Sequence, residues 1–149
     1  MRAWRRFSAL NSQDRRLVVR AAMLLAFTRV GLWVLPFATV RSLLDRYARA
    51  VAAPRIPPAG DTATRTGWAV AAVARRGPGM TCLVQALVAD SLLRRAGLQP
   101  QLRIGVRGRP EPAARRFESH AWVECEGRVV VGDTDGLTGY GVLSAPGRP

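Results

Sequence analysis

Residues 81–97 read T-C-L-V-Q-A-L-V-A-D-S-L-L-R-R-A-G and predict the best-defined helix of the chain. Thr81 is a typical N-cap residue, and Gly97 is typical of the position just after a helix. Arg94 and Arg95 fall in the last turn, where positive charge suits the helix dipole. Apolar residues occupy most sides of this helix, so we expect it to be buried.

The hydrophobic pattern changes from helical to alternating directly after this helix. Residues 101–107 alternate apolar and polar side chains, which predicts a half-buried strand. Residues 119–125, S-H-A-W-V-E-C, and residues 128–133, R-V-V-V-G-D, read as two further strands joined at Glu126-Gly127. A buried helix with short antiparallel strands beside it predicts an α+β fold.

Three further helices are expected before the buried helix. They cover residues 11–30, 37–50 and 62–76, separated by loops that include 53–61 and 77–80. Asn11 or Ser12 is the expected N-cap of the first. We expect a single domain over residues 1–149, with an apolar, basic helical region at 1–60. The remainder, 61–143, holds both cysteines and the histidine.

The length and charge of the chain narrow its class. A chain of 149 residues can bury a core without disulfides or metal ions. Its 23 basic residues, all arginine, face 10 acidic ones, for a net charge of +13. A protein that binds nucleic acid or an anionic membrane could use lysine as well as arginine. The complete absence of lysine therefore indicates a bias of the coding sequence toward arginine. The charge therefore identifies no particular partner.

Residues 21–40 form an apolar stretch that carries one charge, A-A-M-L-L-A-F-T-R-V-G-L-W-V-L-P-F-A-T-V. Arg29 lies near its middle, where a bilayer core would cost about 2.5–3.5 kcal/mol, and Pro36 interrupts it. We therefore expect a buried helix or helix pair, broken near Gly31 or Pro36, rather than a membrane span. An apolar surface that docks on a partner or a membrane face is the alternative. No secretory signal pattern is visible, so a cytoplasmic protein is expected.

The chain holds two cysteines, Cys82 and Cys125, and one histidine, His120. This set excludes a disulfide framework and a four-ligand zinc site of the usual spacing, so we expect no metal or cofactor. Cys82 falls in the first turn of the predicted buried helix. Free N–H groups and partial positive charge there stabilise a thiolate and an oxyanion. Cys125 falls on the opposite strand face from His120 and is expected to be a packed thiol.

The predicted hairpin relates His120 to an acid. A two-residue turn at Glu126-Gly127 pairs residues whose numbers sum to 253, so His120 would lie directly opposite Asp133. Directly opposed side chains share one face, with Cβ atoms roughly 4.5–5.5 Å apart. An aspartate in that position can hold an imidazole in the tautomer that accepts a proton from a thiol.

The candidate catalytic residues are Cys82, His120 and Asp133, in the order nucleophile, base and orienting acid. Asp135 is a second acid, one diagonal step from His120 in the predicted register. Trp122 shares the strand face of His120; ordinary packing is the expected role of its ring, and lining the site is the alternative. Gln85, one turn after Cys82, is near enough to polarise a substrate carbonyl.

Four motifs in the second half of the chain occur together in a known enzyme family. They are T-C-L-V-Q-A-L at 81–87, L-L-R-R-A-G-L at 92–98, R-I-G-V at 103–106 and S-H-A-W-V-E-C-E-G at 119–127. Together they resemble the leader peptidases of lasso-peptide biosynthesis, in the transglutaminase-like branch of the papain-like cysteine enzymes. The resemblance covers about residues 65–135. It implies a transglutaminase-like (papain-like) domain in which N-terminal helices and the cysteine helix pack on a small antiparallel sheet.

This resemblance also implies an activity and partners. It implies a cysteine protease that removes the leader from a ribosomally made lasso-peptide precursor, with Cys82 as nucleophile, His120 as base and Asp133 as orienting acid. The implied partners are the precursor peptide with its leader, a separate leader-binding protein (a RiPP recognition element) and an ATP-dependent macrocyclase, with no nucleic acid. Two alternatives stay open. One is a transglutaminase or acyltransferase with the same triad, and the other is a non-catalytic basic binding module.

Overall fold

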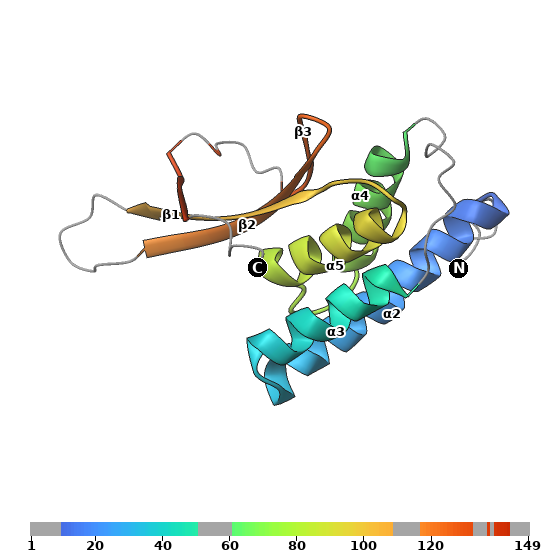
Figure 1. Cartoon of the computed structure of the whole chain (residues 1–149), viewed down its shortest axis with the longest axis horizontal. Coiled ribbons are helices and arrows are strands. Elements are labelled where there is room, and N and C mark those ends of the chain that lie inside the picture. Colours follow the sequence, from blue (N-terminus) through green and yellow to red (C-terminus); the bar gives the residue numbers. More distant parts are fainter. Residues whose placement is uncertain (1–9, 51–60, 109–116, 133–136, 138, 144–149) are drawn as a thin grey trace.

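The computed structural model describes residues 10–50, 61–108, 117–132, 137 and 139–143 (Figure 1). The helices are α2 (Ser12–Val34), α3 (Phe37–Arg49), α4 (Thr62–Ala74) and α5 (Cys82–Arg95). The strands are β1 (Gln101–Gly108), β2 (Phe117–Cys125), β3 (Arg128–Val131) and β4 (Gly141–Leu143). In Figure 1, α5 lies between the sheet and the pair α2–α3, and it contacts both. The predicted α+β class is confirmed.

Helix α5 is the central element of the hydrophobic core. Side chains from α2, α3, α4 and the sheet pack around it, and Leu87, Val88 and Leu93 are almost completely buried. Both predicted ends are confirmed. The Oγ1 of Thr81 accepts a hydrogen bond from the backbone N–H of Val84 at 3.4 Å. Gly97 takes a positive φ of 84°, as helix C-termini commonly require.

The first two helices form a hairpin whose bend lies at Pro36. Helix α2 begins after Asn11, whose side chain accepts a hydrogen bond from the Asp14 N–H at 2.7 Å. It continues through Gly31, where no break occurs. A Cβ on Gly31 would lie 3.2 Å from a methyl of Val40, so this glycine lets α2 and α3 approach closely. The helix ends just before Pro36, because the residue preceding a proline avoids the α conformation.

Only one face of α2 is buried, in contrast to the expected buried helix. Ala21, Leu25 and Thr28 lie in the interior, while much of the opposite side is exposed. By length and composition alone α2 is able to cross a membrane, which is a weak indication. In the fold, however, it packs along α4 and α5. The Nε of Arg65 in α4 donates to Asp14 of α2 at 2.9 Å and ties the two helices together.

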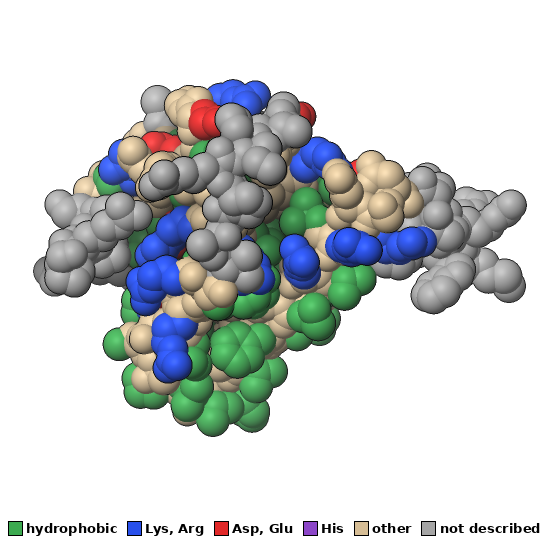
Figure 2. Space-filling view, turned by 45° about the vertical axis from the view of Figure 1, so that its right-hand side comes forward, with side chains coloured by type: hydrophobic (Ala, Val, Ile, Leu, Met, Phe, Trp, Pro, Cys, Tyr) green, Lys and Arg blue, Asp and Glu red, His purple; other side chains and the backbone are tan. Residues whose placement is uncertain are grey.

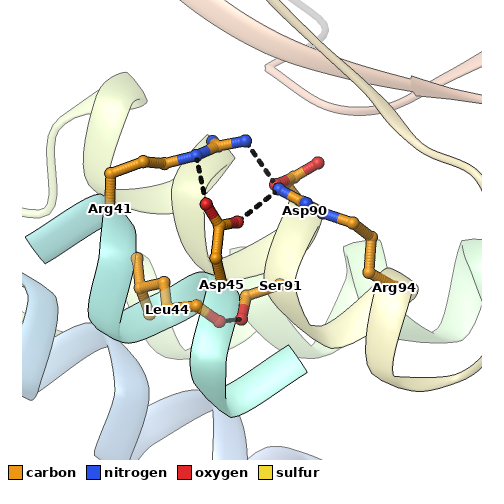
Figure 3. Close-up of polar contacts among 6 residues, drawn as sticks. All are labelled: Arg41, Leu44, Asp45, Asp90, Ser91 and Arg94. Atoms are coloured by element: carbon orange, nitrogen blue, oxygen red, sulfur yellow. Dashed lines mark hydrogen bonds and ion pairs between the residues drawn. The ribbon is translucent and has the colours of Figure 1, made fainter. Parts of the chain in front are cut away.

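A cluster of four charged side chains joins α3 to α5 (Figure 3). Asp90 of α5 is buried, and the Nε of Arg94 donates to its carboxylate at 3.1 Å. Arg41 of α3 lies 3.4 Å from the same carboxylate, and Arg94 lies 2.9 Å from Asp45. Beside the cluster, the Ser91 hydroxyl donates to the Leu44 carbonyl at 3.1 Å. Two aspartates and two arginines thus balance their charges where the helices meet.

The four strands form an antiparallel sheet in the order β3-β2-β1-β4. Strands β1 and β2 pair along their shared length and form the centre of the sheet. Alternate side chains of β2, including Ala121 and Val123, belong to the core. The side chains that alternate with these, His120 and Trp122, lie on the other face of the strand. The short strand β4 was not predicted from the sequence.

The β2–β3 hairpin follows the predicted turn but not the predicted register. Glu126 and Gly127 both take positive φ, 52° and 74°, which is characteristic of a type I′ turn. The described pairs are Cys125 with Arg128, Glu124 with Val129, and Val123 with Val131. Val123 was expected opposite Val130, so β3 carries one extra residue. The first two pairs are those predicted, whereas the predicted register is wrong at Val123; Asp133, which that register was to place opposite His120, lies outside the described residues.

Strand β3 packs closely on α4 at the position of the irregular pairing. A Cβ built on Gly67 would lie only 2.2 Å from the carbonyl oxygen of Val130, so the strand backbone rests directly on the helix. Such an approach is possible only at a glycine. The extra residue falls where this contact bends the strand, as a β-bulge does.

Candidate active site

Cys82 is the first residue of α5 and is half-buried against the core. The loop before it is held from two sides. The side-chain amide of Gln85 donates to the Met80 carbonyl at 2.8 Å, so Gln85 supports the loop instead of facing a substrate. A Cβ on Gly79 would lie 2.5 Å from the guanidinium of Arg29, so α2 presses its one mid-helix charge onto this loop.

His120 lies on β2 directly opposite Gly105 of β1 and is half-buried. Its Nε2 lies 2.8 Å from the carbonyl oxygen of Gly132. A carbonyl can only accept, so Nε2 carries the hydrogen and donates it. In the neutral ring the lone pair is then on Nδ1, which is the nitrogen able to take a proton from a thiol.

Two aromatic rings enclose the imidazole. The Trp122 ring is stacked with His120 at a centroid distance of 6.2 Å, and the Tyr140 ring lies 5.7 Å away. Trp122 is almost fully buried, and its indole N–H donates to Glu124 at 2.8 Å. The prediction that Trp122 shares the face of His120 is confirmed, whereas Tyr140 was not anticipated.

Gly105 provides the space for this arrangement. A Cβ at that position would lie 2.9 Å from the Trp122 ring and 3.0 Å from the Cβ of Tyr140. Any side chain there would displace one of the two rings that flank His120. The aromatic group therefore depends on a glycine in the neighbouring strand.

Tyr140 lies beside His120 and is itself held by charged neighbours. Desolvation raises the pKa of the Tyr140 phenol, and the negative charges of Glu118 and Cys82 raise it further, against the opposing effect of Arg107. Arg107 covers the Tyr140 ring at 4.8 Å and donates to Glu118 at 3.0 Å. Helix α5, which begins at Cys82, contacts β2, the strand that carries His120.

Comparison with known families agrees with this arrangement. A family model described as Transglutaminase-like superfamily matches residues 15–145, from α2 through β4. The chain belongs to the transglutaminase-like superfamily. Searches among curated proteins and among solved structures gave no match. The superfamily commonly contains cysteine peptidases and acyltransferases, so the family match supports thiol chemistry of one of these two kinds.

The two cysteines of this transglutaminase-like domain differ sharply in environment. Cys125 is 2% exposed and belongs to the core, as predicted. Burial raises the pKa of its thiol, with a further contribution from the charge of Glu126. Cys125 is therefore a protonated, inaccessible thiol at neutral pH, whereas Cys82 lies at a helix N-terminus and is partly accessible.

The predicted acids of the transglutaminase-like domain, Asp133 and Asp135, lie outside the described residues. The structure reaches the residue immediately before them, Gly132, whose carbonyl contacts His120. Within the described part of the chain, no group of three or more His, Cys, Asp or Glu side chains is arranged to hold a metal ion.

Proposed function

We propose that this transglutaminase-like domain is a cysteine protease that removes the leader peptide from a lasso-peptide precursor. The observation that carries the proposal is the pairing of two features. Cys82 begins a helix capped by Thr81, and His120 presents a ring whose Nε2 hydrogen is already donated to Gly132. The motifs shared with lasso-peptide leader peptidases supply the substrate class, within a family of cysteine peptidases and acyltransferases.

The proposed reaction uses the nucleophile and base in two stages. The Nδ1 of His120 takes the thiol proton of Cys82, and the sulfur attacks the scissile carbonyl carbon. The N–H groups of the first turn of α5 stabilise the oxyanion. The imidazolium then gives its proton to the leaving amine as the peptide C–N bond breaks. Water, deprotonated by the same imidazole, cleaves the thioester and releases the leader with a free carboxylate.

The proposed partners follow from what the domain must bind. The substrate is the precursor with its leader, and a separate leader-binding chain would raise the local concentration of the scissile bond at Cys82. An ATP-dependent macrocyclase would take the released core peptide in the next step. All of these would meet in the cytoplasm.

The same triad can pass the acyl group to an amine, so the acyl acceptor is the test of the proposed function. We expect two products whose masses add up to the precursor plus one water, even when a primary amine such as ethylamine is present in excess. The measurement is mass spectrometry of the precursor incubated with the domain and the leader-binding chain. A product that carries the amine in place of water would instead indicate a transglutaminase or acyltransferase.

We further propose that Asp133 orients His120. It follows Gly132 directly, so its carboxylate could accept the Nε2 hydrogen that the Gly132 carbonyl accepts in this structure. Asn at the orienting position of the serine-protease template costs about 10⁴-fold in turnover. We expect Asp133→Asn to lose on the order of 10²-fold, because a thiol at a helix N-terminus ionises more easily than a serine.

Asp135→Asn is the matched control for Asp133→Asn, and it should stay within a few-fold of wild type. Initial cleavage rates are compared side by side, with circular dichroism to confirm folding. If Asp135→Asn is the inactive variant, Asp135 rather than Asp133 is the orienting acid.

A further inference from the structure

The outward side of α2 is an apolar surface on which nothing else in the described chain packs. Its members recur at spacings of three and four residues, so they share one side of the helix. This surface, here called the α2 apolar face, consists of Val19, Met23, Phe27, Val30, Trp33 and Val34 and continues into Leu35 and Phe37. Trp33 is 86% exposed and Val34 is 66% exposed. Patches of this kind mark contacts with partners or membranes.

Positive charge borders the α2 apolar face at one end. Arg15, Arg16 and Arg20 are exposed in the first turns of α2, and Arg46 and Arg49 are exposed near the end of α3. Figure 2 shows hydrophobic side chains gathered at the lower end of the molecule, with arginines above them. The surface thus combines an apolar end with a group of five exposed arginines, here called the basic collar.

Acidic side chains do not neutralise this collar. Within residues 10–50 the acids are Asp14 and Asp45. Asp14 forms an ion pair with an arginine of α4, and Asp45 forms ion pairs with arginines of α3 and α5. Arg29, the one charge within the apolar stretch, packs on Gly79 beside the nucleophile loop. Between Met23 and Phe37 the one charged residue is therefore Arg29, which is exposed beside the face and also contacts this loop.

We propose that the α2 apolar face binds an anionic membrane surface, with α2 lying in the plane of the interface. Helices of this kind bury their apolar side about 5–10 Å deep while their arginines contact anionic headgroups. Trp33, Phe27 and Phe37 are the aromatic anchors preferred at that depth. A second copy of the chain is the poorer occupant, because two proteins of net charge +13 repel one another.

This binding mode preserves the fold. A spanning α2 would have to leave α4 and α5 and to place Arg29 in the hydrocarbon. An interfacial α2 keeps its buried face, its ion pair to Arg65 and the contact of Arg29 with Gly79. The membrane would then lie on the helix that also supports the loop before Cys82.

The experiment is co-sedimentation of the full-length protein with vesicles of phosphatidylcholine and phosphatidylglycerol at 3:1, and with vesicles of phosphatidylcholine alone. We expect binding to the anionic vesicles that weakens with added salt.

Trp33→Glu should weaken vesicle binding about tenfold by placing a charge in the apolar contact. Trp68→Glu is the matched control, because Trp68 is also exposed but lies on α4, and it should bind as wild type does. Arg16→Gln with Arg20→Gln should cost about fivefold per arginine.

Several outcomes would overturn the proposal. They are equal binding by wild type and Trp33→Glu, an equal loss in Trp68→Glu, and no vesicle binding by wild type. A concentration-dependent dimer that Trp33→Glu dissolves, without vesicle binding, would assign the face to a second copy instead. Cys82→Ala should bind vesicles like wild type, so the result stands or fails apart from the proposed catalysis.

Discussion

Cys82→Ala is expected to abolish precursor cleavage, with a loss of at least about 10⁴-fold, while Cys125→Ala keeps most of the activity. The difference follows from the two environments. Cys82 begins α5, where free N–H groups point outward, and it is partly accessible. Cys125 is buried in the core, and burial raises the pKa of its thiol.

The two cysteine variants are assayed for precursor cleavage by mass spectrometry, together with alkylation of the wild type by iodoacetamide. Rapid modification should fall on Cys82 and should stop cleavage. Cleavage retained by Cys82→Ala would contradict the cysteine-protease proposal. A wild-type protein with no reactive thiol and no activity would favour the basic binding module instead.

Asp90→Ala is expected to lower the free energy of unfolding by about 3 kcal/mol. The buried Asp90 carboxylate contacts Arg94 and Arg41 where α3 meets α5, and its removal leaves two arginines without that partner. The value lies at the low end for a broken buried pair, because both arginine side chains are partly exposed and still reach water. For a chain of this length the melting temperature should fall by about 6–12 °C.

Asp45→Ala is the matched control for the charged cluster. Asp45 faces the same arginines but is 24% exposed, so its loss should cost about 1 kcal/mol or less. Urea unfolding of the two variants gives the comparison. Equal destabilisation would mean that burial of Asp90 adds nothing to the stability of the α3–α5 contact.

The sequence was sufficient to predict those features that depend on neighbouring residues alone, namely helix ends, the hairpin turn and the face of a strand. Thr81 and Gly97 marked the two ends of α5, because capping depends on hydrogen bonds and φ angles of adjacent residues. Glu126-Gly127 gave the hairpin turn for the same reason. The shared face of His120 and Trp122 followed from the two-residue period of a strand.

Contacts between distant segments account for what the sequence did not predict. The extra residue in β3 falls where Val130 contacts Gly67, which lies on another element and was not visible in the local sequence. Strand β4 has three residues, too few for a periodic pattern, so Tyr140 was not assigned to the site. Composition could not tell which side of the apolar helix α2 the rest of the fold would cover.

The sheet has a further consequence for how a peptide can be held. Its two outer strands, β3 and β4, have four and three residues, while the long strands β1 and β2 lie inside. At β3 the carbonyl of Val130 rests against Gly67. Within the described residues, β3 and β4 themselves therefore offer few backbone groups for adding an extended strand from another chain. A substrate would gain little affinity from main-chain pairing with these two strands, and under the proposed function a separate leader-binding chain would compensate for that loss.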